Sequence, residues 1–346
     1  MTDLLLISGT TRPVRERLDA RFTVHKGALG KDLTGKSEGE SVDAILADRA
    51  EAIEAVFTDG HLGVPQAVVE RLPNLRIISC YGVGYDNIDA QAAAARGIVV
   101  THTPDVLNDE VANTAIALLL ATTRRIVAYD RYIREGRWEN EGGAPLTRGL
   151  RGKRVGMVGF GRIGQTIADK LAVFGCDVAY HARSNKGLEN EYFADLVEMA
   201  RASHVLIVIT PGGPETRHLV SREVMEALGP EGTLVNVARG TVVDEEAMVE
   251  LLRDGKLGAA GLDVFEREPK VPDALFEMEN VVLAPHIGSA TVETRAAMGD
   301  LAVDNLIDFF DHGTVRTPVP ECRDIAEIDR AGADRGATGR VGADRG

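Results

Sequence analysis

Residues 155–164 read V-G-M-V-G-F-G-R-I-G, a short apolar strand that runs directly into the pattern Gly159-x-Gly161-x-x-Gly164. The first glycine permits a tight turn, the second removes a Cβ from the path of a phosphate, and the third lets the next helix pack closely on the strand. Unpaired N–H groups at the start of that helix favour negative charge. Apolar residues at helical spacing continue up to Gly175, which is placed to end the helix. The stretch therefore predicts a dinucleotide-binding strand, turn and helix rather than an ordinary glycine-rich turn.

The rest of the chain alternates short apolar runs with helical patterns. Its 346 residues are too many for one typical core, so two domains are expected. The apolar runs read as buried parallel strands and are clearer after the glycine pattern than before it. We therefore predict an α/β protein with two doubly wound parallel-sheet domains, a flavodoxin-like substrate domain and an inserted Rossmann dinucleotide-binding domain. The strand candidates are residues 4–7, 55–57, 77–79, 98–101, 177–180, 205–209, 233–237, 259–264 and 281–284.

The position of the glycine pattern sets the expected domain boundaries. A chain that opened with its dinucleotide domain would carry the pattern near its start, whereas here it begins at Gly159. We expect a discontinuous substrate domain formed by residues 1–103 and 289–320, and a dinucleotide-binding domain formed by residues 104–288. The helical patterns expected to connect them are residues 105–125 and 291–310.

Two segments depart from this rhythm. Residues 129–150 contain Trp138, two glycines and a proline, and are expected to form an arm that extends from the dinucleotide-binding domain. Residues 331–346 repeat Ala-Asp-Arg-Gly without an apolar face to bury, so this tail is predicted to be disordered.

Composition and charge argue against several classes of partner. The formal net charge of −14 argues against nucleic acid and anionic membranes, because a broad basic surface would be needed to neutralise phosphates. The three cysteines have neither metal-ligand spacing nor an even number for disulfides, which favours a reducing compartment and no metal site. The apolar runs are too short to span a bilayer and the N-terminus lacks a signal-peptide pattern, so a cytoplasmic location is expected.

Polar residues follow several of the predicted strands. Arg239, Asp263 and His286 each come at the end of an apolar run, and Glu268 lies in the loop after Asp263. Ligands of open α/β sheets bind beyond the carboxyl ends of the strands, so these side chains are expected to face one cleft. Taken singly, each has an ordinary interpretation as an ion-pair partner, a helix cap, a solvated charge or a buried histidine. Together they predict a redox site.

Those residue types match the needs of hydride transfer to a 2-oxo acid. Negative charge develops on the carbonyl oxygen, and histidine is a proton donor that works near neutral pH. A carboxylate such as Glu268 would orient the His286 ring and favour its protonated form. Arg239 would bind the substrate carboxylate through two parallel hydrogen bonds. Asp263 would orient the nicotinamide carboxamide.

Six motifs stand at separate places along the chain: residues 82–89 (G-V-G-Y-D-N-I-D), 103–107 (T-P-D-V-L), 159–164, 236–240 (N-V-A-R-G), 261–269 (G-L-D-V-F-E-R-E-P) and 285–288 (P-H-I-G). Together they resemble the D-isomer-specific 2-hydroxyacid dehydrogenase family, over a span from about Leu4 to about Glu321. The related formate dehydrogenases carry glutamine where this chain has Glu268, so formate is not the expected substrate. The loop at residues 211–216, P-G-G-P-E-T, resembles the branch of glyoxylate, hydroxypyruvate and hydroxyphenylpyruvate reductases. Asn113 departs from the family, whose members usually carry an acid there.

The resemblance implies roles for particular residues. Arg239, Glu268 and His286 would be the catalytic three, and the backbone amides of Val83 and Gly84 would hold the substrate carboxylate alongside Arg239 and His286. A homodimer is also implied, whose subunits exchange the arm and in which the arm's tryptophan either caps the partner's substrate pocket or packs the interface. The residues expected to bind the cofactor are Gly159, Phe160, Gly161, Arg162, Ile163, Gly164, Arg183, Ser184, Lys186, Thr210, Pro211, Val237, Ala238, Arg239, Asp263, His286 and Gly288.

One segment bears on the choice of cofactor. An NAD-specific fold usually places an acidic residue about 20 residues past the glycines, to bind the ribose 2′-hydroxyl. This chain instead reads Y-H-A-R-S-N-K at residues 180–186, which supplies the cations Arg183 and Lys186 and the hydroxyl of Ser184. Those groups suit a 2′-phosphate, and the alternative is an ordinary basic loop. NADPH is therefore the expected cofactor, with NADH as the alternative.

The sequence thus predicts an oxidoreductase that reduces a small 2-oxo acid, glyoxylate or hydroxypyruvate, to the D-2-hydroxy acid with NADPH. One alternative is an NAD-linked phosphoglycerate-type dehydrogenase, against which stand the missing acid and the lack of a folded regulatory domain after Phe310. Another is a non-enzymatic, dinucleotide-sensing corepressor on the same fold. The intact catalytic three argue against it. The physiological 2-oxo acid is left open, because side chains of the arm and the first domain would shape that pocket.

Overall fold

The computed structural model of the chain describes residues 1–29 and 39–325. The tail predicted to be disordered, residues 331–346, lies outside the described residues.

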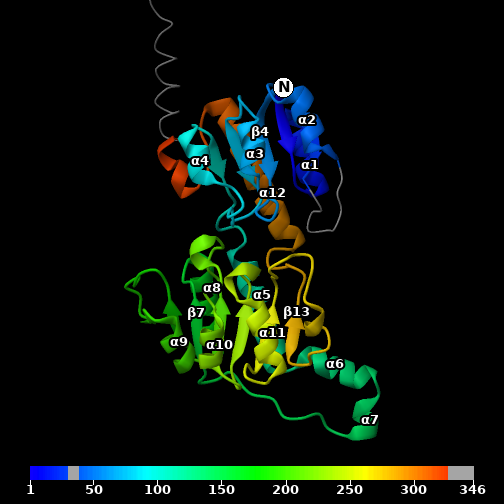
Figure 1. Ribbon diagram of the computed structural model, residues 1–346, viewed down its shortest axis with the longest axis vertical. Coiled ribbons are helices and arrows are strands. Elements are labelled where there is room, and N and C mark those ends of the chain that lie inside the picture. Colours follow the sequence, from blue (N-terminus) through cyan, green and yellow to red (C-terminus); the bar gives the residue numbers. More distant parts are fainter. Residues whose placement is uncertain (30–38, 326–346) are drawn as a thin grey trace, which may run out of the picture. The chain divides into compact units, whose positions relative to one another are not determined.

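The chain divides into two compact units (Figure 1). The first comprises Met1–Leu107 and the chain from Val292 onward, and the second comprises Asn108–Thr291. The divisions expected from the sequence, at 103/104 and 288/289, lie a few residues before these. Each unit is built on its own parallel sheet, which confirms the predicted fold class.

The first unit contains a six-stranded sheet with strand order β3-β2-β1-β4-β5-β6. Apolar side chains of β1, β4 and β5 are almost completely buried, as expected for the centre of a parallel sheet. Helix α12 packs against α1 and β5. The strands are β1 (Thr2–Leu6), β2 (Phe22–Ala28), β3 (Glu40–Ser41), β4 (Ile53–Thr58), β5 (Ile77–Cys80) and β6 (Val99–Thr101). The helices are α1 (Arg12–Arg21), α2 (Val42–Arg49), α3 (Gln66–Glu70), α4 (Ala90–Ala95), α12 (Val292–His312) and the 3₁₀ turn η4 (Pro320–Cys322).

The second unit contains a seven-stranded sheet with strand order β13-β12-β11-β10-β7-β8-β9. Helices α9, α10 and α11 enclose one hydrophobic cluster with the sheet, while α5 packs with α8 and against β11 and β12. The strands are β7 (Arg154–Val158), β8 (Asp177–His181), β9 (Glu191–Tyr192), β10 (Val205–Val208), β11 (Thr233–Asn236), β12 (Ala259–Leu262) and β13 (Val281–Leu283). The α-helices are α5 (Asn108–Thr123), α6 (Ile126–Arg134), α7 (Arg137–Glu141), α8 (Arg162–Val173), α9 (Leu196–Ala202), α10 (Arg222–Leu228) and α11 (Glu245–Arg253). The 3₁₀ turns are η1 (Pro214–Thr216), η2 (Gly240–Val242) and η3 (Asp273–Leu275).

The strand order of the second unit reverses between β7 and β10. From β7 the chain builds outward through β8 and β9, and it then returns to add β10 to β13 on the other side. Such a reversal opens a crevice beyond the carboxyl ends of the strands, where ligands of doubly wound sheets bind. The glycine pattern follows β7 and therefore lies at this point.

Helices α6 and α7, with the segment that follows them, project from the sheet of the second unit (Figure 1). They form the first part of the arm expected at residues 129–150. Within the described residues, no single helix is long and apolar enough to cross a membrane. The bent pair α5 and α6 passes that test only by length and composition.

Candidate active site

His286 and Glu268 form a direct pair at the carboxyl ends of neighbouring strands. His286 follows β13, and Glu268 lies in the loop after β12. The distance from His286 Nδ1 to Glu268 Oε2 is 2.7 Å, and the two side chains are 26% and 11% exposed. A carboxylate beside Nδ1 favours the tautomer with the proton on that nitrogen, which leaves Nε2 as the nitrogen that can exchange a proton with a ligand.

Asp263 holds the loop that carries His286. His286 has a left-handed backbone (φ 53°), and its N–H donates to the Asp263 carbonyl at 2.8 Å. The N–H groups of Ile287 and Gly288 donate to the two oxygens of the Asp263 carboxylate at 2.7 and 2.8 Å. Burial raises the pKa of Asp263, while these two backbone bonds oppose the rise. Asp263 therefore braces the His286 loop, and its expected role toward the nicotinamide carboxamide stays a prediction.

Arg239 sits in a turn that is shaped by Asn236, the last residue of β11. The Asn236 side chain accepts the Ala238 N–H at 3.1 Å and donates to the Arg239 carbonyl at 3.0 Å. Val237 and Ala238 are buried, while Arg239 is half-buried and its Nη1 donates to the Ala238 carbonyl at 2.9 Å. The turn fixes the backbone from which the guanidinium projects.

The glycine pattern has the spacing and the space that a pyrophosphate requires. Gly159 has φ 97°, and a Cβ there would lie 2.8 Å from the Ile209 carbonyl oxygen. A Cβ on Gly164 would lie 2.9 Å from the Gly159 carbonyl oxygen, so the start of α8 can approach the turn only because it carries glycine. A Cβ on Gly161, the N-cap of α8, would meet nothing within 4 Å. Gly161 therefore leaves space at the start of α8, and a helix N-terminus at this point is where a pyrophosphate binds in dinucleotide folds.

Other residues of the predicted cofactor set border this turn. Thr210 and Pro211 follow β10, and a Cβ on Gly159 would also lie 2.9 Å from the Thr210 nitrogen. Phe160 is only 2% exposed and its ring stacks on Tyr180 at 4.5 Å, so its side chain belongs to the core. Arg162 is exposed at the first position of α8, whereas the neighbouring Ile163 is half-buried.

The loop after β8 presents Arg183, Ser184 and Lys186 on the surface, and all three are exposed. A buried tyrosine, Tyr180, supports the backbone of this loop through hydrogen bonds. The Tyr180 hydroxyl donates to Asn185 Oδ1 and accepts the Lys186 N–H, both at 2.9 Å, and the Gly187 N–H donates to the same Asn185 oxygen at 2.8 Å. The tyrosine thus shapes a loop whose cationic and hydroxyl side chains point to solvent.

Val83 and Gly84 lie in the loop after β5 of the first unit. The Val83 carbonyl is 3.0 Å from His102 Nδ1, and the Gly84 carbonyl accepts from Cys80 Sγ at 3.5 Å. Their expected role in holding the substrate carboxylate stays a prediction.

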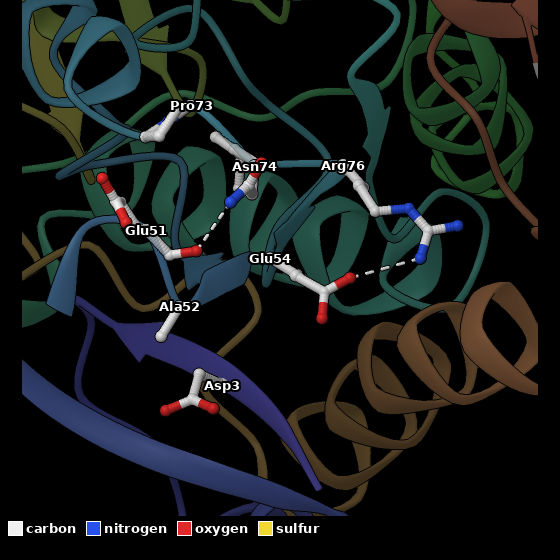
Figure 2. A pocket seen from close by; sticks show the side chains of 8 residues that line it. Asp3, Glu51, Ala52, Glu54, Pro73, Asn74 and Arg76 are labelled. Carbon is white, nitrogen blue, oxygen red and sulfur yellow. Dashed lines mark hydrogen bonds and ion pairs between the residues drawn. The ribbon is translucent and has the colours of Figure 1, made fainter.

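Figure 2 shows a pocket of the first unit, with a volume of about 550 Å³. It lies at the amino ends of β1, β4 and β5, the edge opposite to that at which such sheets bind ligands. Its polar side chains bond to their neighbours. Asn74 donates to the Glu51 carbonyl at 2.7 Å, and Arg76 pairs with Glu54 at 3.3 Å. We therefore place the candidate site in the second unit.

Sequence reasoning did not single out Glu245, and it gave no role to Gly240 although that residue ends the matching segment 236–240. Both contact the loop that carries Glu268. Glu245, the first residue of α11, accepts the Glu266 N–H at 3.0 Å, and Gly240 lies against the Phe265–Glu266 peptide. The only signal for Glu245 was an acid in the first turn of a helix, which is common at any helix start. Asn113 is exposed on α5 and donates to Glu110 at 3.1 Å.

Comparison with known proteins identifies relatives of the whole described architecture. The family model described as D-isomer specific 2-hydroxyacid dehydrogenase, NAD binding domain, matches residues 116–288. A hydroxyphenylpyruvate reductase from Plectranthus scutellarioides is 48% identical over 275 residues, which cover 79% of this chain and 88% of that protein. A 2-ketogluconate reductase from Gluconobacter oxydans is 42% identical over 320 residues, which cover 92% of this chain and 98% of that protein.

A solved structure of a related reductase is also similar to this chain. The NADPH-dependent glyoxylate/hydroxypyruvate reductase from Sinorhizobium meliloti, in complex with NADP and malonate, is similar with a TM-score of 0.84 and 45% identity. The match covers 92% of this chain and 97% of that one.

Proposed function

The chain belongs to the D-isomer-specific 2-hydroxyacid dehydrogenase family, and on that premise we propose that it reduces a small 2-oxo acid to the D-2-hydroxy acid with NADPH as the preferred reductant. Glyoxylate and hydroxypyruvate are the leading substrates. The observation that carries the proposal is the 2.7 Å contact between His286 Nδ1 and Glu268 Oε2 beyond the ends of β12 and β13. A reductase needs a proton donor backed by a carboxylate, whereas a nucleotide-sensing protein needs no such pair.

His286 is the proton donor in this proposal. Bound NADPH supplies a hydride to the carbonyl carbon of the substrate. Negative charge then develops on the carbonyl oxygen, and His286 Nε2 donates a proton to it. Glu268 stabilises the charged imidazole before the transfer and keeps the ring oriented during it. In the reverse direction, the same neutral imidazole accepts the proton of the hydroxy acid.

Arg239 binds the substrate carboxylate, because a guanidinium remains charged throughout the pH range and matches a carboxylate with two parallel hydrogen bonds. The turn shaped by Asn236 supports this role by holding the Arg239 backbone.

The preference for NADPH rests on the loop after β8. Arg183, Ser184 and Lys186 together supply two cations and a hydroxyl for a 2′-phosphate, at the place where an NAD-specific fold usually carries an acid. The similarity to the NADPH-dependent enzyme from Sinorhizobium meliloti supports the same choice. NADH remains an alternative reductant with lower efficiency.

The similar proteins are named for 2-oxo acids of different size. The similar proteins include reductases of hydroxyphenylpyruvate, of glyoxylate and hydroxypyruvate, and of 2-ketogluconate. The 2-ketogluconate reductase matches the largest share of this chain among those three, which makes a sugar acid the second candidate substrate.

We further propose a homodimer in which the arm contributes to the interface. Ile126, Ile133 and Trp138 of α6 and α7 are 55%, 57% and 61% exposed, an apolar surface that would be covered in such an assembly. Size-exclusion chromatography with light scattering should give twice the mass of the chain, and replacing Ile133 and Trp138 by aspartate should give the monomer. A monomeric wild-type protein would contradict this assembly. The cytoplasmic location stays a prediction from the sequence.

The experiment that tests the proposed function measures NADPH oxidation across a panel of 2-oxo acids. We expect glyoxylate and hydroxypyruvate to exceed pyruvate and 2-oxobutyrate in kcat/KM, since one methylene typically changes transition-state binding by about 1–3 kcal/mol. The panel includes hydroxyphenylpyruvate and 2-ketogluconate. In reverse, D-glycerate but not L-glycerate should be oxidised. A strong preference for an aliphatic 2-oxo acid would move the chain to another branch of the family, and activity with no 2-oxo acid would refute the proposed function.

A further inference from the structure

Two consecutive backbone N–H groups, those of Phe265 and Glu266, each donate to a carboxylate. The Phe265 N–H donates to Glu268 Oε1 at 3.0 Å, while the other oxygen of Glu268 contacts His286. The next N–H, that of Glu266, donates to Glu245 Oε2 at 3.0 Å. Glu245 begins α11, so an element outside the loop fixes the peptide whose neighbouring N–H orients Glu268.

Gly240 presses on the same peptide from the Arg239 side. A Cβ at Gly240 would lie 1.9 Å from the Phe265 carbonyl carbon and 2.2 Å from the Glu266 nitrogen. No real Cβ approaches that closely, so only glycine allows this contact. The turn that carries Arg239 and the loop that carries Glu268 therefore share one tightly packed contact.

The Glu266 side chain is anchored to a third segment. Glu266 Oε1 lies 2.6 Å from Arg217 Nη2 and 3.5 Å from His218 Nε2, and the side chain is 20% exposed. The His218 N–H donates in turn to the Thr241 carbonyl at 2.9 Å, beside Gly240. Three contacts therefore hold the loop just before Glu268: the hydrogen bond to Glu245, the packing of Gly240, and the ion pairs of Glu266.

Glu245 occupies a place that is unfavourable for a charge. Burial raises the pKa of Glu245, and the nearby carboxylates of Glu266 and Glu268 add to this effect, while the bond from the Glu266 N–H and the charge of Arg267 oppose it. A carboxylate that is held among other carboxylates carries an electrostatic cost, and such costs concentrate at functional sites.

We propose that Glu245 is a positioning residue for the proton-donating pair: by accepting the Glu266 N–H, it fixes the Phe265–Glu266 peptide and thereby the preceding N–H, that of Phe265, which directs Glu268 toward His286. The inference rests on the proposed function in that His286 is the proton donor there. It adds a residue that touches neither substrate nor cofactor and acts through two backbone groups.

Three substitutions at residue 245 separate the position of the hydrogen-bond acceptor from the negative charge. Glu245→Gln keeps an acceptor oxygen at the same distance and loses the charge. Glu245→Asp keeps the charge and withdraws the acceptor by one methylene. Glu245→Ala loses both. Glu246→Ala is the matched control, because Glu246 is the exposed neighbour in the same helical turn. Since glutamine and alanine both lose the charge, the difference between them reports the hydrogen bond together with the packing of the side-chain stem, and Glu245→Asp, which keeps most of the stem, separates these two.

The first readout is kinetic. Misplacing a catalytic group by about 1 Å can reduce the rate about a hundredfold, and partial loosening should cost less. We expect Glu245→Ala and Glu245→Asp to lower kcat by about tenfold with an unchanged KM for NADPH. Glu245→Gln should retain at least about half of the wild-type kcat, and Glu246→Ala should match wild type.

The second readout needs no activity. The His286 ring proton Hε1, assigned by its loss in His286→Ala, is titrated by NMR in the protein without added ligand. Loosening Glu268 removes part of the stabilisation of the charged ring, so the titration midpoint should move to lower pH by about half a unit in Glu245→Ala, less in Glu245→Gln, and most in Glu268→Gln.

Equal midpoints in all Glu245 variants and wild type, or a wild-type kcat in Glu245→Ala, would overturn the inference. So would a Glu245→Asp variant that behaves as wild type while Glu245→Gln behaves as alanine, because the charge alone would then be responsible. Failure of the proposed function is seen separately, as a wild-type protein that reduces no 2-oxo acid.

Discussion

Two parts of the second unit, for which we propose contacts to ligands, are built in different ways. The reaction segment, residues 263–288, keeps the side chains of Asp263, Glu268 and His286 mostly buried. The two carboxylates accept backbone N–H groups, and that of Glu268 also contacts the His286 imidazole. The phosphate loop, residues 183–187, exposes its side chains and is shaped from below by the Tyr180 hydroxyl. Proton transfer depends on the exact placement of two atoms, whereas attraction to a phosphate acts over several ångströms and tolerates side-chain movement. We therefore expect substitutions in the reaction segment to change kcat, and substitutions in the phosphate loop to change the affinity for the cofactor.

The largest effect is expected at His286. His286→Ala should lower turnover by several powers of ten while NADPH still binds, because proton transfer alone is worth about 10²–10⁴-fold and the charge on the oxygen would also be unmatched. Single-turnover reduction gives the rate, and fluorescence titration gives the affinity for NADPH. His312→Ala, at the exposed end of α12, is the control. Turnover near wild type would remove His286 from the reaction, and with it the distinction between the two segments.

An intermediate effect is expected at Arg183. Charge-assisted hydrogen bonds are worth about 1.5–3 kcal/mol each, so Arg183→Ala should raise the KM for NADPH about ten- to a hundredfold and leave that for NADH and the kcat nearly unchanged. Arg201→Ala, an exposed arginine of α9, is the control. If wild type used both cofactors equally, or if the variant lost both alike, the loop would have no role in cofactor choice.

A smaller effect is expected at Tyr180. Tyr180→Phe keeps the buried ring and its stacking on Phe160 but removes the hydroxyl that bonds Asn185 and the Lys186 N–H. A hydrogen bond contributes about 0.5–1.5 kcal/mol net, so NADPH should weaken about two- to tenfold through a less ordered loop, with kcat unchanged. Steady-state kinetics with both cofactors measures the change. A loss of kcat instead would show that the phosphate loop is coupled to the chemistry.

The strands that the sequence predicted well are the fully buried ones. Residues 205–209 and 233–237 were expected as strands because their side chains are almost all apolar, and β10 and β11 lie there in the middle of the sheet. Strand β2, with the sequence F-T-V-H-K-G-A, was not expected, because its side chains are only partly buried and include His25 and Lys26. The two-residue strand β9 depends on the backbone of β8 rather than on any pattern of its own.

For the site, the sequence indicated which residues lie at strand ends but not what they bond to. Period and spacing placed His286 and Glu268 beyond neighbouring strands, and the structure brings them into contact. The side-chain direction of Phe160 could not be read from its place between two glycines. Glu245 pairs with a backbone group 21 residues away, so only the three-dimensional path of the loop reveals it.

The smallest expected effect concerns the pH dependence of stability at Glu245. Its pKa in the folded protein is raised by burial above the ordinary value of 4.5, so the folded state holds this proton more tightly than the unfolded state does. Stability contributed by this group is therefore fully present below the ordinary value and is lost as pH rises through the raised one. At neutral pH, Glu245→Gln should melt at a higher temperature than wild type, by up to about 2–4 °C, a difference on the order of 1 kcal/mol for a unit of this size. As pH falls toward 4.5, the wild-type carboxyl becomes protonated and the two melting temperatures should converge.

Arg183→Gln in the phosphate loop should show no such convergence, since its guanidinium is exposed and stays charged across this range. Circular dichroism melts of the three proteins between pH 4 and 8 measure the differences. A gap that is constant with pH, or that widens on acidification, would show that Glu245, which supports the reaction segment, carries no more electrostatic cost than the exposed loop.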